Sequence, residues 1–274
     1  MSVDFKESST AALVEVAFSV GFEEFHRLMR YELDDLHSTK YAEQFPNDEE
    51  KAPQKPFIEE DDGGLAALPS ASPITNIRRW FSNDDRSGLV QVQRNWFARN
   101  WRVTVQDSGN GTALPYPGYA ALRADFSDSL HDFIDFVRDT DLGEFKPLQC
   151  EISYRLQLRA GSLWEDPGEL GRVARIFSRQ PGAYLPDLEA MRIITQYVIP
   201  DGSGERVGRL YGRLETASSG DDTHFLILTM FARGTPLGSG VEGTLAFQDT
   251  GHRWIVNGVR DFLTPEAVEW YDLD

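Results

Sequence analysis

The chain has 274 residues, a hydrophobic content of 41% and a formal net charge of −17, from 44 acidic and 27 basic side chains. This composition is typical of a folded protein with a sizeable core, and no apolar run approaches the ~20 residues that span a bilayer. The N-terminus lacks the pattern of a secretory leader. A single cysteine, Cys150, excludes an intramolecular disulfide and a cysteine-ligated metal cluster. We therefore expect a cytoplasmic protein that does not bind membranes.

Acidic side chains are concentrated in the first quarter of the chain. Residues 1–75 have a net charge of −10, and two acidic clusters, Asp48–Glu50 and Glu59–Asp62, lie among proline and glycine residues in 46–73. Self-repelling charge with proline and glycine buries too little apolar area to order itself. The pattern predicts that 46–73 is an exposed, inserted loop or linker. The alternative is an acidic arm that docks on a basic partner.

Arginines and aromatic rings are interleaved in the segment that follows. Residues 76–103 have a net charge of +4 and contain five tryptophan or phenylalanine rings. Such groups could hold a phosphate or stack a base, but half-buried strands in which arginine stems cover apolar surface give the same pattern. The charge of the whole chain argues against broad nucleic-acid binding. The candidate binding residues here are Arg78, Arg79, Arg94, Trp96, Arg99 and Trp101.

The elements expected in the first half alternate between strands and helices. A period of two predicts a strand over 13–20, and apolar residues at helical spacing predict an amphipathic helix over 22–44. A hairpin is predicted over 77–105. Its second strand is a long one over 89–105, and a change of phase near Arg94 in this strand indicates a β-bulge. The apolar stripe after Tyr116 predicts a second long helix that Gly143 closes.

The clearest strand follows, because Leu148–Leu158 alternates strictly between apolar and polar side chains, as in an antiparallel sheet with one buried face. Cys150 is on the apolar side of this pattern. The remaining expected elements are a short helix near 168–178, strands near 188–199, 206–217 and 224–233, a helix over 239–263, and a terminal helix that Thr264 caps.

This order predicts an α+β fold in which a twisted antiparallel sheet packs against long amphipathic helices. The chain divides into two loosely similar halves, 1–159 with the acidic insertion and 160–274 with a three-strand meander and C-terminal helices. We expect the two halves to form one unit.

Several short motifs, in order along most of the chain, resemble those of an uncharacterised, sporadically distributed prokaryotic protein family. The matching segments are Ala12–Phe18, Arg79–Asp84, Leu89–Gln93, Trp101 with Tyr116, Tyr119 and Phe126, Cys150–Leu158, and Phe262–Trp270. Ala12 stands where that family has proline, and Ser153–Gln157 departs from its usual strand motif. The resemblance implies a shared fold and a prokaryotic or phage-related origin, and it supplies no catalytic residues.

Motifs for catalysis, nucleotide binding and metal binding are missing from the sequence. There is no Gly-x-Ser-x-Gly elbow, no phosphate-binding glycine loop and no pair of histidines at metal-ligand spacing. We therefore predict no catalytic residue, no metal and no cofactor. Arg209, Tyr211 and Arg213 share one face of a strand with Glu215, where they could grip an acidic ligand or form a ladder with acids of a neighbouring strand.

The sequence favours a non-enzymatic, protein-binding or regulatory module, which the resemblance would place in a prokaryotic defence, toxin–antitoxin or mobile-element system. The alternative is a protein that binds a phosphate ligand or nucleic acid through the arginine-rich hairpin at 77–102. Self-association through exposed strand edges is a variant of the first hypothesis.

Overall fold

A computed structural model gives the architecture. It describes residues 5, 12–54, 57–59, 65–67, 77–104, 115–161, 163–177, 184, 186, 188–218 and 223–273. The strands are β1 (Leu13–Phe22), β2 (Asn47–Lys51), β3 (Phe57–Glu59), β4 (Leu65–Ala67), β5 (Arg78–Ser82), β6 (Gly88–Gln93), β7 (Trp96–Arg102), β8 (Pro147–Arg159), β9 (Arg192–Pro200), β10 (Arg206–Ser218) and β11 (His224–Gly234). Nine of them form one sheet in the order β2-β5-β6-β7-β1-β8-β11-β10-β9, and β3 pairs with β4.

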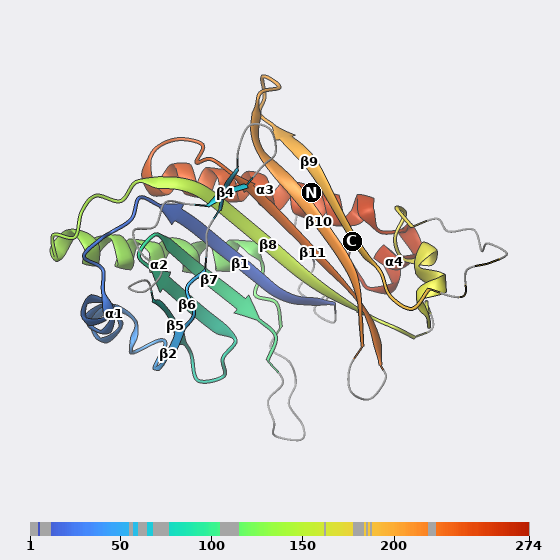
Figure 1. Ribbon diagram of the computed structural model, residues 1–274, viewed down its shortest axis with the longest axis horizontal. Coiled ribbons are helices and arrows are strands. Elements are labelled where there is room, and N and C mark those ends of the chain that lie inside the picture. The colour runs from blue at the N-terminus through green and yellow to red at the C-terminus, as the bar shows by residue number, and fades with distance from the viewer. Residues whose placement is uncertain are drawn as a thin grey trace.

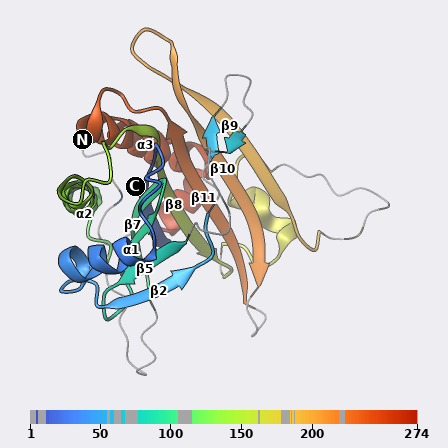
Figure 2. The same cartoon turned by 60° about the vertical axis from the view of Figure 1, so that its left-hand side comes forward.

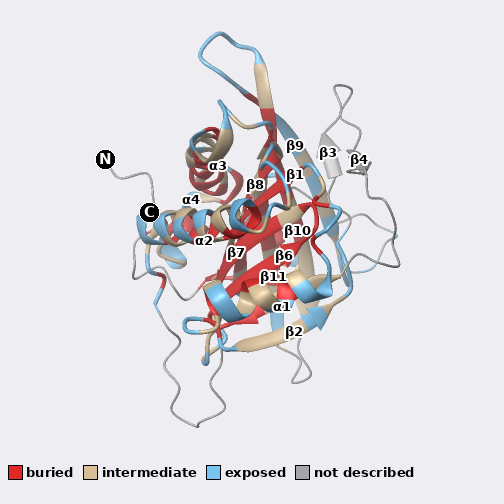
Figure 3. Cartoon of the chain, turned by 90° about the vertical axis from the view of Figure 1, so that its left-hand side faces the viewer, coloured by how far each residue is buried: buried red, intermediate tan, exposed pale blue. Residues whose placement is uncertain are grey.

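The helices cover one face of this sheet. They are α1 (Arg30–Leu36), the π-helical turn η2 (His37–Tyr41), α2 (Tyr119–Asp139), the 3-10 helix η3 (Pro167–Arg172), α3 (Gly240–Phe262) and α4 (Pro265–Trp270). In Figure 1, α2 and α3 lie side by side behind the large sheet. The short β3–β4 hairpin is next to β11. In Figure 3 much of the central sheet and of α3 is coloured as buried. None of the described helices is long and apolar enough to cross a membrane.

Alternation along the central strands explains the core. In β1, Val16, Phe18 and Val20 are fully buried on the face that the helices cover, as the period of two predicts. In β8, the five residues from Cys150 to Leu158 that share this face are also fully buried. All strand pairs of the large sheet are antiparallel. These strands are therefore confirmed.

The predicted fold class, a sheet packed against long amphipathic helices, is wrong. A nine-stranded antiparallel sheet dominates the molecule, and in the described part of the chain only α2 and α3 are longer than seven residues. The helix expected over 22–44 is the main error, because Phe22 ends β1, Phe25 and Leu28 lie in a loop, and α1 begins only at Arg30. These side chains are buried in the same core, so their spacing imitates one face of a helix.

Two further predictions in the first half are corrected. The long strand expected over 89–105 is two strands, β6 and β7, which pair at Gln93 and Trp96 across a tight turn at Arg94 and Asn95. The change of phase therefore marks a turn and not a bulge. Within the expected loop at 46–73, β2 pairs with β5, so these residues belong to the sheet. Residues 60–62 of the second acidic cluster lie outside the described residues.

Most elements of the second half agree with the prediction, but the short helix expected near 168–178 is the 3-10 helix η3, and the strand expected near 188–199 begins only at Arg192. The meander of β9, β10 and β11 and the helix α3 lie where the pattern places them. Thr264 caps α4 through a hydrogen bond that its hydroxyl accepts from the Ala267 N–H, with Pro265 at the first helical position. The large sheet runs without interruption from β2 to β9, and β8 pairs with both β1 and β11 (Figure 2).

Candidate ligand-binding cavity

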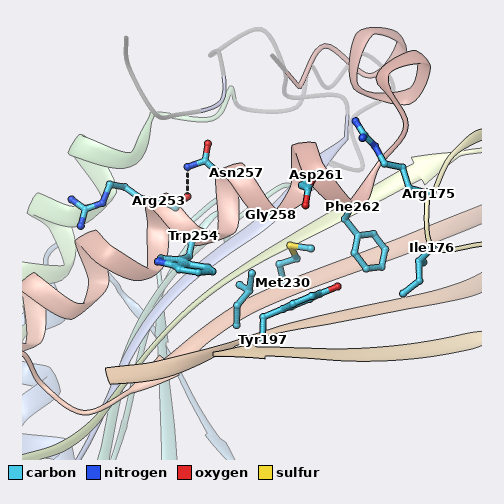
Figure 4. A pocket seen from close by; sticks show the side chains of 11 residues that line it. Arg175, Ile176, Tyr197, Met230, Arg253, Trp254, Asn257, Gly258, Asp261 and Phe262 are labelled. Carbon is cyan, nitrogen blue, oxygen red and sulfur yellow. Dashed lines mark hydrogen bonds between the residues drawn. The ribbon is translucent and has the colours of Figure 1, made fainter. Parts of the chain in front are cut away.

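A cavity of about 760 Å³ opens between the C-terminal half of α3 and strands β9–β11 (Figure 4). The described residues that line it are Arg175, Ile176, Tyr197, Leu210, Met230, Arg253, Trp254, Asn257, Gly258, Asp261 and Phe262. They come from the segment after η3, from all three strands of the meander and from α3. The fold thus assembles this cavity from residues that lie far apart in the sequence.

The floor of the cavity is apolar and buried. Leu210, Met230 and Phe262 are at most 6% exposed. Gly258 lets the helix approach the sheet closely, since a Cβ atom there would lie 2.9 Å from Leu210 Cδ2 and 3.3 Å from Met230 Sδ. Apolar rings continue to the rim, where Tyr197 is 44% exposed. Exposed apolar surface of this kind is typical of binding sites.

Polar side chains stand at the mouth. Arg253, Asn257 and Asp261 follow one another at intervals of four residues along the exposed side of α3. Arg175 lies at the other end of the row (Figure 4), where its Nε donates a hydrogen bond of 2.7 Å to the Leu263 carbonyl at the end of α3. The rim of the apolar cavity therefore carries two guanidinium groups and the Asp261 carboxylate. Arg253 also donates to the Thr250 hydroxyl at 3.2 Å, and the Asn257 amide points away from the strands, toward the Arg253 carbonyl (Figure 4).

A smaller, polar hollow of about 290 Å³ lies on the opposite face of the sheet, over β5, β6, β7, β1 and β8. A row of hydrogen bonds crosses it, in which Arg78 donates to Gln91 at 3.4 Å, Gln91 to Asn100 at 2.8 Å and Asn100 to Glu15 at 2.8 Å. The hydrogen bonds among these groups explain the polar lining of the hollow without a ligand.

The predicted binding residues of the 77–102 segment do not form one site. Arg79, Arg99 and Trp101 lie on the helix-covered face of the sheet, and Arg78 and Trp96 lie on the opposite face. Arg94 is in the turn between β6 and β7. Trp101 packs against Tyr116 at 5.4 Å between ring centroids, which makes it part of the core.

Three of these arginines are buried and have carboxylate partners in the chain. Arg79 donates to Asp48 from Nε at 2.8 Å and also pairs with Asp34. Arg94 Nε lies 3.2 Å from a Glu24 carboxylate oxygen, and Arg99 lies 3.3 Å from Asp125 of α2. Part of the acidic first quarter thus neutralises the basic segment that follows it. This arrangement matches half-buried strands with arginine stems over apolar surface.

The residues singled out on β10 face away from α3. Tyr211 stacks on Phe231 at 4.7 Å with 9° between the ring planes. Arg213 donates to Glu215 at 2.8 Å, and Arg192 of β9 reaches the same carboxylate at 3.0 Å. Arg209 is buried on the same face. The acid that Arg213 contacts, Glu215, is on β10 itself. None of these residues is among the described residues that line the α3 cavity.

Two buried groups need no ligand to explain them. Burial raises the pKa of the Cys150 thiol to about 12, so it stays protonated and behaves as a small apolar residue. Between α2, α3 and β8, the Tyr119 ring stacks on His252 at 3.7 Å, and the hydroxyl of Tyr154 hydrogen-bonds His252 Nδ1 at 2.8 Å. These contacts bind the helix layer to the sheet.

The sequence reasoning missed the cavity, although weak signals were present. Trp254 and Gly258 lie four residues apart on α3, and a glycine within an apolar helical stripe marks a place where another element comes close. Tyr197 is an aromatic residue in a strand that turned out to be an edge. Neither signal reveals a cavity until the pairing order of the strands is known.

Comparisons with known proteins add no assignment. The chain matches no family model and shows no significant similarity to a curated protein or to a solved structure. None of these comparisons supports the resemblance to an uncharacterised prokaryotic family. Among the described residues, no group of three or more histidine, cysteine, aspartate or glutamate side chains could hold a metal ion.

Proposed function

We propose that this protein binds an amphipathic small molecule, with an apolar body and an anionic group, in the α3 cavity, and that it acts by binding. The observation that carries this proposal is the open, largely apolar cavity of about 760 Å³ with arginines at its mouth. Its volume lies within the ~300–1,000 Å³ range of small-molecule sites, and such sites combine apolar walls with a few placed polar groups.

The charges at the mouth support an anionic ligand. Among the described residues that line the cavity, Arg253 and Arg175 outnumber the one carboxylate, Asp261, so this part of the rim has a positive balance in a chain with a net charge of −17. Guanidinium groups bind carboxylates, sulfonates and phosphates through charge-assisted hydrogen bonds. The aromatic ring of Trp254 and the thioether of Met230 suit a flat or flexible apolar body.

A titration with anilinonaphthalene sulfonate tests the proposal, because this probe joins aromatic rings to an anionic group. We expect saturable, one-site binding to the native protein, measured by probe fluorescence, and displacement by an alkyl carboxylate. Arg253→Glu and Trp254→Ala should each weaken binding about tenfold, which is the loss of roughly one charge-assisted or ring contact.

The matched control is Arg138→Glu, which makes the same charge reversal on the exposed end of α2 and should leave binding within about twofold. Circular dichroism of each variant verifies that it is folded. Non-saturable binding to the native protein, or equal affinities for the native protein and for both cavity variants, would contradict the proposal.

The alternative, a phosphate-ligand or nucleic-acid site in the 77–102 hairpin, has less support. Its arginines are divided between two faces, and Arg79, Arg94 and Arg99 already have carboxylate partners. A protein partner, and a role in a defence, toxin–antitoxin or mobile-element system, stay predictions from the sequence.

A further inference from the structure

The edge of the sheet at β9 differs from the edge at β2. β2 carries Asp48, Glu49, Glu50 and Lys51, and charged edge strands resist pairing with another chain. β9 is longer, with nine residues, and has no charged side chain between Arg192 and Pro200. Two of its aliphatic side chains are well exposed, Ile194 at 68% and Val198 at 52%. An apolar, uncharged edge of this length is a template for another strand.

The backbone of β9 presents a regular set of hydrogen-bonding groups at this edge. The Met191 carbonyl accepts from the Thr216 N–H, and the Asp201 N–H donates to the Glu205 carbonyl. The backbone N–H and C=O groups of the odd-numbered residues of β9 therefore point toward β10. Alternation then places the backbone groups of Ile194, Gln196 and Val198 on the outer side. Within the part of the chain that the structure describes, the backbone of 193–199 hydrogen-bonds only to β10. Proline at position 200, which has no N–H, ends this outer row.

We propose that β9 pairs with β9 of a second copy of this chain, antiparallel and centred on Gln196, so that two sheets join into one across a two-fold axis. In this register Ile194 lies opposite Val198 of the second copy, and Ile193 lies opposite Ile199. Each exposed aliphatic side chain thus meets an aliphatic partner, and such cross-strand pairs are the stabilising unit of a sheet.

The charge near β9 is compatible with a second copy as the occupant. The same register places Arg192 opposite Pro200 of the second copy, where Arg192 keeps its ion pair with Glu215 of its own chain. The acidic excess of the chain lies in the first quarter, where residues 1–75 carry −10. In the large sheet, residues of this first quarter form β1 and β2, and β2 is the edge strand farthest from β9. Residues 192–218, which form β9, its turn and β10, carry four basic and three acidic side chains, so little like charge accumulates at this edge. This inference is independent of the α3 cavity.

Sedimentation velocity over a concentration series tests the proposal with two double variants. Ile194→Lys with Val198→Lys brings two pairs of like charges together in the proposed register. Ile194→Lys with Val198→Glu removes the same two aliphatic side chains but brings opposite charges together. We expect the native chain and the Lys/Glu variant to dimerise, and the dissociation constant of the Lys/Lys variant to rise at least tenfold.

A cross-linking measurement checks the register separately. Gln196→Cys lies on the proposed two-fold axis, so oxidation should give a disulfide-linked dimer on a non-reducing gel, while the native Cys150 is buried. The control is Tyr31→Cys, at a 77% exposed position on α1 and away from the proposed interface. It should form no disulfide link and should run as a monomer on the same gel. The proposal would be overturned if the native chain were monomeric at all concentrations, or if the two double variants associated equally. It would also be overturned if this edge bound a peptide of another protein but no second copy of the chain.

Discussion

Asp249 shows how a single side chain links the two main helices. Its carboxylate, on α3, accepts hydrogen bonds of 2.6 Å from the Tyr119 hydroxyl and of 2.6 and 3.0 Å from Arg123, both on α2. Burial alone would raise the pKa of Asp249, but these hydrogen bonds and the Arg123 charge outweigh it, and the pKa lies below its ordinary value. The ionised form is therefore the one that stabilises the fold.

This pKa gives a pH-dependent prediction for Asp249→Asn. The variant should lower the free energy of unfolding by about 1–2 kcal/mol at pH 7, because a charged acceptor of three hydrogen bonds becomes a neutral one. A depressed native pKa stabilises the fold above the unfolded pKa, which is about 4. The deficit should therefore shrink as the pH falls from 5 through the lowered pKa, when urea unfolding is measured at each pH.

The control is Asp135→Asn, which removes an exposed ion pair with Arg138 on α2 and should change stability by less than about 0.5 kcal/mol. A deficit for Asp249→Asn that is the same at pH 3 and pH 7 would mean that its charge does not hold the helices together.

At the scale of elements, two glycines set how α3 lies on the sheet. At Gly251 a Cβ atom would lie 2.7 Å from Ile152 Cγ2 and 2.9 Å from Ala232 Cβ, which are fixed close to the backbone of β8 and β11. At Gly258 it would meet the ends of two flexible side chains, Leu210 and Met230, which border the cavity. The helix therefore packs tightly against the sheet at its middle and less tightly toward its C-terminal end.

Alanine at these two positions should have opposite effects. Gly251→Ala should destabilise the protein by about 1–2 kcal/mol, because overpacking outweighs the gain in helix propensity. Gly258→Ala should be neutral or stabilise it by up to about 1 kcal/mol, because the neighbouring side chains can move into the cavity. Paired urea denaturation curves measure both changes, and equal shifts for the two variants would refute this account of α3 packing.

The elements also show how far the sequence could predict the structure. Val16, Phe18 and Val20 all point into the core and the residues between them point to the other face, so the period of two was sufficient to predict β1. Phe22, Phe25 and Leu28 serve a strand end and a loop, and no local pattern separates that case from a helix. The cavity could not be predicted, because Tyr197, Leu210 and Met230 come together only through the pairing order of β9, β10 and β11.

At the scale of the whole molecule, the sheet joins the two proposed halves of the chain. β8 pairs along its length with β1 on one side and with β11 on the other, so no boundary in the sheet separates the halves. The core is also continuous, since buried residues from Phe97 in β7 to Leu210 in β10 belong to one cluster. We therefore expect both halves to unfold together.

Phe97→Ala tests this cooperativity from one side of the sheet. The ring is fully buried, and its loss should cost about 3–5 kcal/mol. Hydrogen exchange should then show the same loss of protection in β7 and in β10, which lies four strands away in the sheet order. The conservative control Phe97→Leu should cost less and affect both strands equally. Faster exchange confined to β7 would mean that the halves unfold independently.

The acidic strand β2 has a consequence for solubility at high concentration. If another molecule could add a strand at both edges of a sheet, each added molecule would leave a free edge for the next one. Such a sheet could grow without limit into fibres. Here the charged side chains of β2 oppose the addition of a further strand at that edge. Strand addition at the β9 edge stops at two molecules, because a two-fold pairing uses this edge of both copies.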